Sequence, residues 1–229
     1  MSPPGDPAAQ VLLDFQREAR TGLAEAVFCA RKNPRQIGEI LERFRDRDLP
    51  CLLTRLAPKK YHQLPADWQT QLDFDELSHT AVLGQPAPAR PYRVAVVSGG
   101  TSDAPVCAEA ARTLAFYGVD SEQFQDVGVT GLWRLLERLD EIRGYPIVIA
   151  VAGMEGAIFS VLGGLVEAVL IAVPTSVSYG AGPDGQLALH AALGSCAPGI
   201  VTVNIDNGYG AACAAIRVMN HWERARRTK

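Results

Sequence analysis

From residue 93 onward, short apolar runs alternate with segments whose apolar residues recur at helical spacing. The runs at 147–151 and 169–173 are rich in β-branched residues, which is typical of parallel strands covered on both faces. The predicted strands cover residues 93–98, 119–124, 145–150, 169–173 and 200–203, and the predicted helices cover 104–117, 130–139, 155–168, 187–193 and 209–222. This alternation predicts an α/β fold with a doubly wound, flavodoxin-like parallel sheet and right-handed crossovers.

Residues 1–83 show a different pattern. Apolar residues fall at helical spacing over residues 11–30, with Gly22 as the expected break. A second helix is predicted after Asn33-Pro34, an N-cap followed by proline at the first helical position. Residues 49–54 predict a short strand. We therefore expect a small, mainly helical N-terminal domain, whose first ten residues, rich in Pro, Gly and Ala, are disordered.

A segment punctuated by prolines, residues 84–91, predicts a linker between this domain and a larger one over residues 92–229. His62 and His79 precede the linker and have no third ligand at metal spacing. We therefore expect no metal site in the N-terminal domain and assign it no chemistry.

In open α/β sheets, ligands bind beside the carboxyl ends of the strands. The predicted loops there are residues 98–103, 126–134, 153–156, 176–182 and 204–208. They are rich in Gly, Ser, Asp and Asn, which allow tight turns and backbone hydrogen bonds to a ligand. Glu155 lies at one of these bends, where it either faces a pocket or only favours a helix N-terminus.

The loop from Ser98 to Asp103 has two interpretations. It offers amides and hydroxyls to an anion, or it is a capped turn with Ser102 or Asp103 as the N-cap. It has neither the glycine spacing of a dinucleotide fingerprint nor the lysine of a P-loop.

Other loop residues also have alternatives. Asp126 and Arg134 flank the start of a predicted helix, and Arg134 either turns toward the pocket or lies on the surface. Asp206 or Asn207 either caps the last helix or belongs to a phosphate-binding site formed by the neighbouring backbone amides.

Cys196 lies between a predicted helix end and a Pro-Gly turn, whereas Cys107 and Cys213 lie within predicted helices. A thiolate is a strong nucleophile where a positive potential lowers its pKa, although most lone cysteines are small buried apolar residues. The loop setting makes Cys196 the candidate nucleophile.

Composition and charge narrow the classes of protein to which this chain can belong. A chain of 229 residues with 48% apolar residues can build a sizeable core, and a net charge of −3 gives no reason to expect a nucleic-acid partner. The basic C-terminal residues are expected to be a solvated tail. The apolar stretch 147–173 contains Glu155 and Glu167, which favours strand–helix–strand over a membrane span. No secretory signal follows Met1, and five cysteines without a C-x-x-C pair favour the cytoplasm.

Several motifs occur in one order: Ser98-Gly-Gly-Thr-Ser-Asp103, Asp126-Val-Gly-Val, Ala152-Gly-Met-Glu-Gly-Ala157, Ser178-Tyr-Gly180, Gly194-Ser-Cys-Ala-Pro-Gly and Val203-Asn-Ile-Asp-Asn-Gly-Tyr-Gly. Together they resemble the pyridinium-3,5-biscarboxylic acid mononucleotide synthase family, known as LarB, of nickel-pincer nucleotide cofactor biosynthesis. The resemblance covers residues 92–221 and extends more loosely to residues 20–25 and 54–55.

The second domain is in turn similar to phosphoribosylaminoimidazole carboxylase, which shares the Gly-Ser-x-Ser-Asp type of loop and is octameric. That carboxylase has a catalytic histidine in its second loop. The corresponding residues 126–134 contain none, and Trp133 stands where synthase relatives often have His. The missing histidine argues against purine chemistry.

The resemblance implies a reaction on nicotinic acid adenine dinucleotide. Its pyridinium ring is carboxylated by carbon dioxide or bicarbonate and its phosphoanhydride is hydrolysed, giving the dicarboxylated mononucleotide and AMP. Cys196 would add to ring carbon 4, which makes carbon 5 nucleophilic, and Glu155 would remove the proton from the carboxylated carbon. Magnesium would act through the substrate phosphates, since no dedicated metal cluster is evident.

The same resemblance implies substrate contacts and a homo-oligomer, an octamer by analogy. Ser98, Ser102 and Asp103 would hold ribose or phosphate, and Asp126 and Arg134 would orient the substrate carboxylate and phosphate. Asp206 and Asn207 would join them as substrate-binding residues. The alternatives are an aminoimidazole ribonucleotide carboxylase and a nucleotide-sensing module without catalysis.

Overall fold

The computed structural model describes residues 12–227, and the chain divides into two compact units between Pro86 and Ala87. This dividing point lies inside the segment 84–91 that the prolines mark as a linker. Residues 1–10, for which the sequence predicts disorder, lie outside the described residues.

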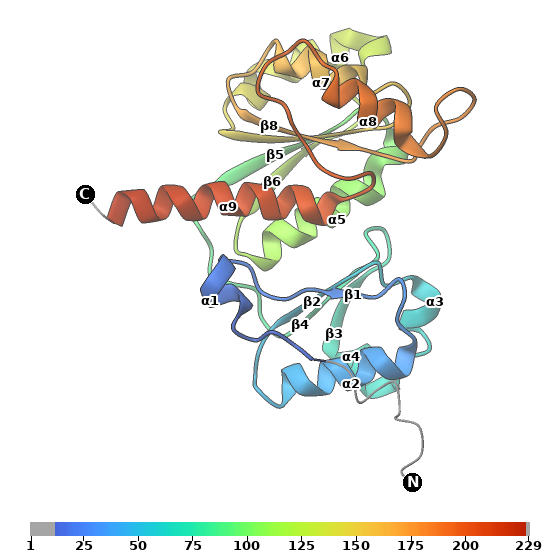
Figure 1. Ribbon diagram of the computed structural model, residues 1–229, viewed down its shortest axis with the longest axis vertical. Helices are drawn as coiled ribbons and strands as arrows, with labels where there is room; N and C mark the ends of the chain where they lie inside the picture. Colours follow the sequence, from blue (N-terminus) through green and yellow to red (C-terminus); the bar gives the residue numbers. More distant parts are fainter. Residues whose placement is uncertain (1–11, 228–229) are drawn as a thin grey trace. The chain divides into compact units, whose positions relative to one another are not determined.

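The N-terminal unit contains a four-stranded sheet in the order β1-β2-β4-β3 (Figure 1). The strands are β1 (Val27–Phe28), β2 (Cys51–Thr54), β3 (Leu72–Asp75) and β4 (Thr80–Leu83), and the described helices are α1 (Arg17–Thr21), α2 (Pro34–Arg45), α3 (Pro58–Tyr61) and α4 (Ala66–Gln71). Strand β1 is parallel to β2, whereas β4 is antiparallel to both β2 and β3. The sequence predicts helices and one strand here, residues 49–54, and misses the three other strands of the sheet. Strands of two to four residues are too short to show a clear alternation.

Helix α2 begins as the sequence predicts. The Asn33 side chain accepts a hydrogen bond from the Gln36 amide at 2.9 Å, and the Gln36 side chain accepts one from the Asn33 amide at 3.0 Å. This reciprocal pair satisfies two amides that lack a partner within the helix. The apolar face of α2 is buried in the core of the unit, as Ile37, Ile40, Leu41 and Phe44 show.

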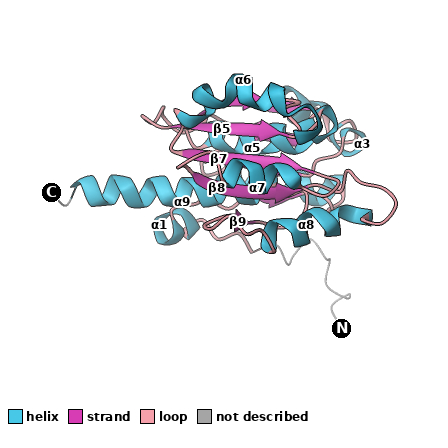
Figure 2. Ribbon diagram, turned by 90° about the horizontal axis from the view of Figure 1, so that it is seen from above, coloured by secondary structure: helices cyan, strands magenta, loops and turns pink. Residues whose placement is uncertain are grey.

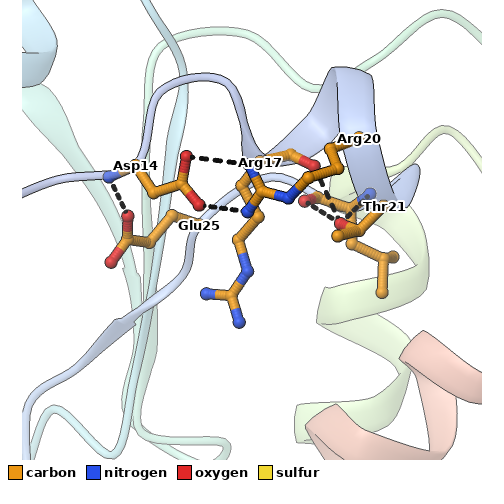
Figure 3. A network of polar contacts seen from close by, with 6 residues as sticks. Asp14, Arg17, Arg20, Thr21 and Glu25 are labelled. Carbon is orange, nitrogen blue, oxygen red and sulfur yellow. Dashed lines mark hydrogen bonds and ion pairs between the residues drawn. The ribbon is translucent and has the colours of Figure 1, made fainter.

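Of the helical segment predicted over residues 11–30, with a break at Gly22, only the five residues of α1 are helical. Gly22 ends it in the left-handed conformation, at φ 73°. Figure 3 shows how polar contacts fold the flanking chain: the Asp14 carboxylate pairs with Arg20, and the Asp14 amide donates to the Glu25 carboxylate. These contacts turn the chain toward β1, so the helix does not continue.

The C-terminal unit contains a five-stranded parallel sheet in the order β6-β5-β7-β8-β9. The strands are β5 (Arg93–Ser98), β6 (Asp120–Phe124), β7 (Ile147–Ala152), β8 (Val169–Pro174) and β9 (Val201–Thr202), and the helices are α5 (Ala104–Phe116), α6 (Leu132–Arg143), α7 (Ala157–Gly163), α8 (Gln186–Leu193) and α9 (Gly208–Arg227). Helices α6, α7 and α8 cover one face of the sheet, and α5 and α9 cover the other (Figures 1 and 2). The predicted doubly wound, flavodoxin-like fold is confirmed.

Every residue of β7 is buried. The strand pairs with β5 and β8 at its two edges, and helices cover both of its faces (Figure 2). The main departure from the predicted elements is α7, which begins at Ala157 and ends at Gly163 instead of covering 155–168. Gly156 adopts φ 61° before the helix, so Glu155 belongs to the preceding loop. Between residues 12 and 227 no helix is both long and apolar enough to cross a membrane.

Candidate active site

A cavity of about 230 Å³ lies at the carboxyl ends of β5 and β7 in the C-terminal unit. Four loops form it, those that follow β5, β6, β7 and β8. Its lining includes Gly99, Gly100, Ser102, Asp103, Gly128, Val129, Thr130, Gly153, Met154, Glu155 and Val177. The cavity therefore lies where the parallel topology predicts a ligand.

Asp103 lies in the lining of this cavity and is buried. Its carboxylate, in a residue only 3% exposed, accepts hydrogen bonds from the Gly100 amide at 2.9 Å and from the Thr175 hydroxyl at 2.7 Å. Burial raises the pKa of Asp103 above its ordinary value, while the hydrogen bonds from Thr175, Gly100 and the Gly153 backbone act in the opposite direction. One carboxylate thus ties together the loops after β5, β7 and β8.

Glu155 lies in the loop between β7 and α7, is exposed, and lines the cavity. Its loop is held from both sides. The Met154 amide donates to the Val177 carbonyl at 2.9 Å, and a Cβ on Gly153 would lie 2.0 Å from that same oxygen. Met154 itself adopts φ 50°, a left-handed conformation unusual for a methionine. The fold therefore fixes the backbone on which Glu155 stands.

The two serines of the first loop differ in position. Ser102 is exposed and lines the cavity, as a substrate-binding residue would. Ser98 is 1% exposed and lies at the end of β5, where its hydroxyl accepts a hydrogen bond from the Asp126 amide at 3.2 Å. Ser98 is not in the cavity lining, and its observed contact joins two of the loops.

Asp126 and Arg134 form an ion pair beside the cavity. Asp126 adopts φ 57°, and the Arg134 guanidinium packs over Gly131. Neither side chain belongs to the lining, but the residues between them, Gly128 to Thr130, do. The pair fixes this loop against α6. Trp133 is 62% exposed and points away from the core.

Asp206 and Asn207 follow β9 and are also outside the lining. The Asn207 side chain accepts from the Gly210 amide at 2.8 Å, so it caps α9, one of the two roles considered for it. Asp206 accepts from the Ser176 amide at 2.8 Å and thereby joins the loop after β9 to the loop after β8. Their observed contacts are with the chain itself.

Cys196 is the exposed cysteine among the described residues, whereas Cys29, Cys51, Cys107 and Cys213 are buried. Burial raises the pKa of Cys29 and of Cys107 to about 12. The Cys196 loop follows α8 and does not contribute to the cavity lining. The structure thus brings Ser102, Asp103 and Glu155 together in the cavity lining and leaves Cys196 outside it, in the loop between α8 and β9.

The sequence reasoning missed Thr175, and it placed Gly153 and Val177 in loops without giving them a role. All three hold the loops in place. Thr175 follows Pro174 at the end of a buried strand and is 0% exposed, so a hydroxyl there requires a polar partner. That is the signal that could have identified it. Over the described part of the chain, no cluster of three or more His, Cys, Asp or Glu residues could hold a metal ion.

Comparison with known proteins matches both units to families. Residues 8–85 match the LarB/PurE-like N-terminal domain, and residues 93–229 match the AIR carboxylase family. The chain is 33% identical over 211 residues to an uncharacterized protein of Methanocaldococcus jannaschii, covering 89% of this chain and 81% of that protein.

Two other relatives match the second unit. N5-carboxyaminoimidazole ribonucleotide mutase of Pyrococcus abyssi is 32% identical over 136 residues, which are 56% of this chain and 74% of that enzyme. The Pyrococcus horikoshii enzyme of the same name is 32% identical over 132 residues, 55% of this chain and 71% of the enzyme. With its LarB/PurE-like N-terminal domain, the chain belongs to the LarB-like, PurE-related branch of the AIR carboxylase family.

Proposed function

We propose that this protein carboxylates the pyridinium ring of nicotinic acid adenine dinucleotide and hydrolyses its phosphoanhydride. The products are pyridinium-3,5-biscarboxylic acid mononucleotide and AMP. The observation that carries the proposal is the exposed carboxylate of Glu155 in the lining of the cavity, in a chain that carries both a LarB/PurE-like domain and an AIR carboxylase domain.

The chemistry requires a nucleophile because a pyridinium is too electron-poor to attack carbon dioxide. The Cys196 thiolate forms a bond to ring carbon 4, and the ring becomes a neutral dihydropyridine whose carbon 5 attacks carbon dioxide. Glu155 removes the proton from carbon 5, and expulsion of the thiolate restores the aromatic ring. Overall, carbon dioxide replaces a proton, and water cleaves the anhydride.

The remaining residues have supporting roles in this proposal. Ser102, exposed in the lining, donates to a ribose hydroxyl or phosphate oxygen, and the loop held by Asp126 and Arg134 closes one side of the cavity. Asp103 and Asp206 act mainly through the loops that they join. Because the described residues offer no metal cluster, any magnesium enters on the substrate phosphates, and no step here depends on it.

Cys196 must approach the ring for this reaction. It does so either along α7 within one chain or from a neighbouring copy in a homo-oligomer, which we propose as the working form. Exposed apolar side chains on one face of the second unit favour such an assembly: Leu132, Trp133 and Leu136 on α6, and Leu187 and Leu193 on α8.

A purine-type reaction on an aminoimidazole ribonucleotide is the second candidate, because the two Pyrococcus relatives carry a mutase name. Its catalytic histidine has no counterpart here. The histidines of the second unit are His190 and His221, and neither lines the cavity. The cavity thus lacks the proton carrier that this chemistry uses.

Mass spectrometry of the purified protein incubated with nicotinic acid adenine dinucleotide and ¹³C-bicarbonate tests the proposal. We expect AMP together with a mononucleotide that carries one labelled carboxyl group. Turnover of an aminoimidazole ribonucleotide alone would establish the second candidate instead. Binding of the dinucleotide without any product would show a nucleotide-sensing module.

A further inference from the structure

Helix α7 connects the cavity with the Cys196 loop. Its first residues, Ala157 and Ile158, line the cavity directly after Glu155. Ser160 and Gly163 follow Ala157 at intervals of three, so these residues lie on one face of the helix. Ser160 lies three residues, about 4.5 Å of helix rise, beyond Ala157.

The Cys196 loop packs on this same face. The hydroxyl of Ser160 lies 2.7 Å from the hydroxyl of Ser195. The Ser195 hydroxyl also accepts a hydrogen bond from the Ala197 amide at 3.1 Å, so the turn closes around Cys196. One turn further along α7, a Cβ on Gly163 would lie 2.8 Å from the side chain of Ala197, so only glycine lets the loop come this close.

We propose that Ser160 is a positioning residue: its hydrogen bond to Ser195 holds the Cys196 loop on the α7 face that leads to the cavity. The bond restricts the loop on both sides of the thiol, since Ser195 precedes Cys196 and the amide it binds follows it. On the other side of the turn, a Cβ added to Gly199, at φ 86°, would meet no atom within 4 Å. The hydroxyl pair is thus a direct polar contact between α7 and the turn that carries the thiol.

This inference rests on the proposed function, because a positioned thiol matters only if Cys196 is the nucleophile. A badly placed nucleophile costs rate more than it costs affinity. In S160A we therefore expect kcat to fall about 10- to 100-fold with KM for nicotinic acid adenine dinucleotide nearly unchanged. The S160T variant keeps the hydroxyl, so its kcat should be close to that of the wild-type chain. S121A, in β6 away from the cavity, is the matched control and keeps the wild-type rate.

The second measurement needs no substrate. Amide hydrogen exchange followed by mass spectrometry should show faster exchange in residues 194–200 of S160A than of the wild-type chain, with exchange in β7 unchanged. The double variant S160A/S195A should lose no more activity than S195A, because both changes break the same bond.

The kinetic and the hydrogen-exchange measurements distinguish a failure of the positioning role from a failure of the proposed function. Unchanged exchange of residues 194–200 in S160A overturns the hydroxyl contact whatever the reaction is. Faster exchange with unchanged kcat overturns the positioning role. If the wild-type chain makes no carboxylated product, or if C196A retains full activity, the proposed function fails first and the positioning role fails with it.

Discussion

The buried carboxylate of Asp103 accepts a hydrogen bond of 2.7 Å from the hydroxyl of Thr175, which lies 72 residues further along the chain. This bond joins the loop after β5 to the end of β8. The Gly100 amide completes the arrangement at 2.9 Å. A residue expected to bind substrate is thus also the point where the cavity walls are held together.

We first predict that Asp103→Asn destabilises the protein by about 1–3 kcal/mol, because an amide nitrogen would face donors that need an acceptor. Burial raises the pKa of Asp103 above 3.8, so the folded state binds its proton more tightly than the unfolded state does. The stability due to that proton is fully present below the unfolded pKa and is lost as pH rises through the folded pKa.

Urea unfolding of both proteins over a series of pH values checks this. The advantage of the wild-type chain over D103N should be largest at the acid end of the series and should shrink as pH rises. Parallel stability curves would show that Asp103 has no raised pKa. Thr175→Val, which removes only the donor hydroxyl, should lower stability by about 1 kcal/mol.

We predict that Gly153→Ala distorts the Glu155 loop, since the added Cβ would lie 2.0 Å from the Val177 carbonyl oxygen. Relief of the clash must move the backbone, at a cost of about 1–3 kcal/mol. The midpoint temperature of thermal unfolding and the turnover rate should both fall. Gly164→Ala is the control, because its nearest neighbours lie at 3.7 Å, an ordinary contact distance. Equal behaviour of the two variants would contradict this prediction.

The sequence was sufficient for the parallel sheet because β5, β7 and β8 are buried runs with clear boundaries. It also located Ser102, Asp103 and Glu155, whose loops follow those strands. It was not sufficient for the sheet of the N-terminal unit, whose β1 has only two residues and depends on pairing with β2, far along the chain.

The contacts that hold the loops were beyond sequence reasoning for a related reason. Thr175 and Asp103 are distant in sequence, and the pairing of β7 with both β5 and β8 brings their side chains within bonding distance. The same holds for Ser160 and Ser195, which meet because α7 and α8 lie on one face of the sheet (Figure 2). Local patterns predict elements, whereas such pairs depend on the assembled fold.

Glu155→Gln should reduce the rate of product formation about 10²- to 10⁴-fold, because the amide cannot accept the proton from ring carbon 5. Glu155 is exposed in its loop, so the free energy of unfolding should change little. Steady-state kinetics with a parallel urea titration measure both. An E155Q protein that turns over at the wild-type rate would remove Glu155 from the mechanism.

Trp133→Glu should break the proposed homo-oligomer into smaller species. The side chain is 62% exposed between Leu132 and other apolar side chains of α6, and a buried carboxylate at an interface is costly. Sedimentation velocity of the purified chain measures the change. Arg217→Glu, an exposed substitution on α9 at the opposite face of the sheet, should leave the assembly intact. A wild-type chain that sediments as a monomer would exclude the oligomer.

Finally, iodoacetamide at neutral pH should modify Cys196 selectively in the folded protein. Cys196 is exposed and Cys213 is buried. Burial also raises the pKa values of the Cys29, Cys51 and Cys107 thiols well above the ordinary value. Because only the thiolate reacts, these residues are protected by both access and protonation. Peptide mapping should find one labelled site before unfolding and all five cysteines labelled in urea. The labelled protein should have lost the capacity to form product, and activity that survives complete labelling of Cys196 would show that its sulfur takes no part in the reaction.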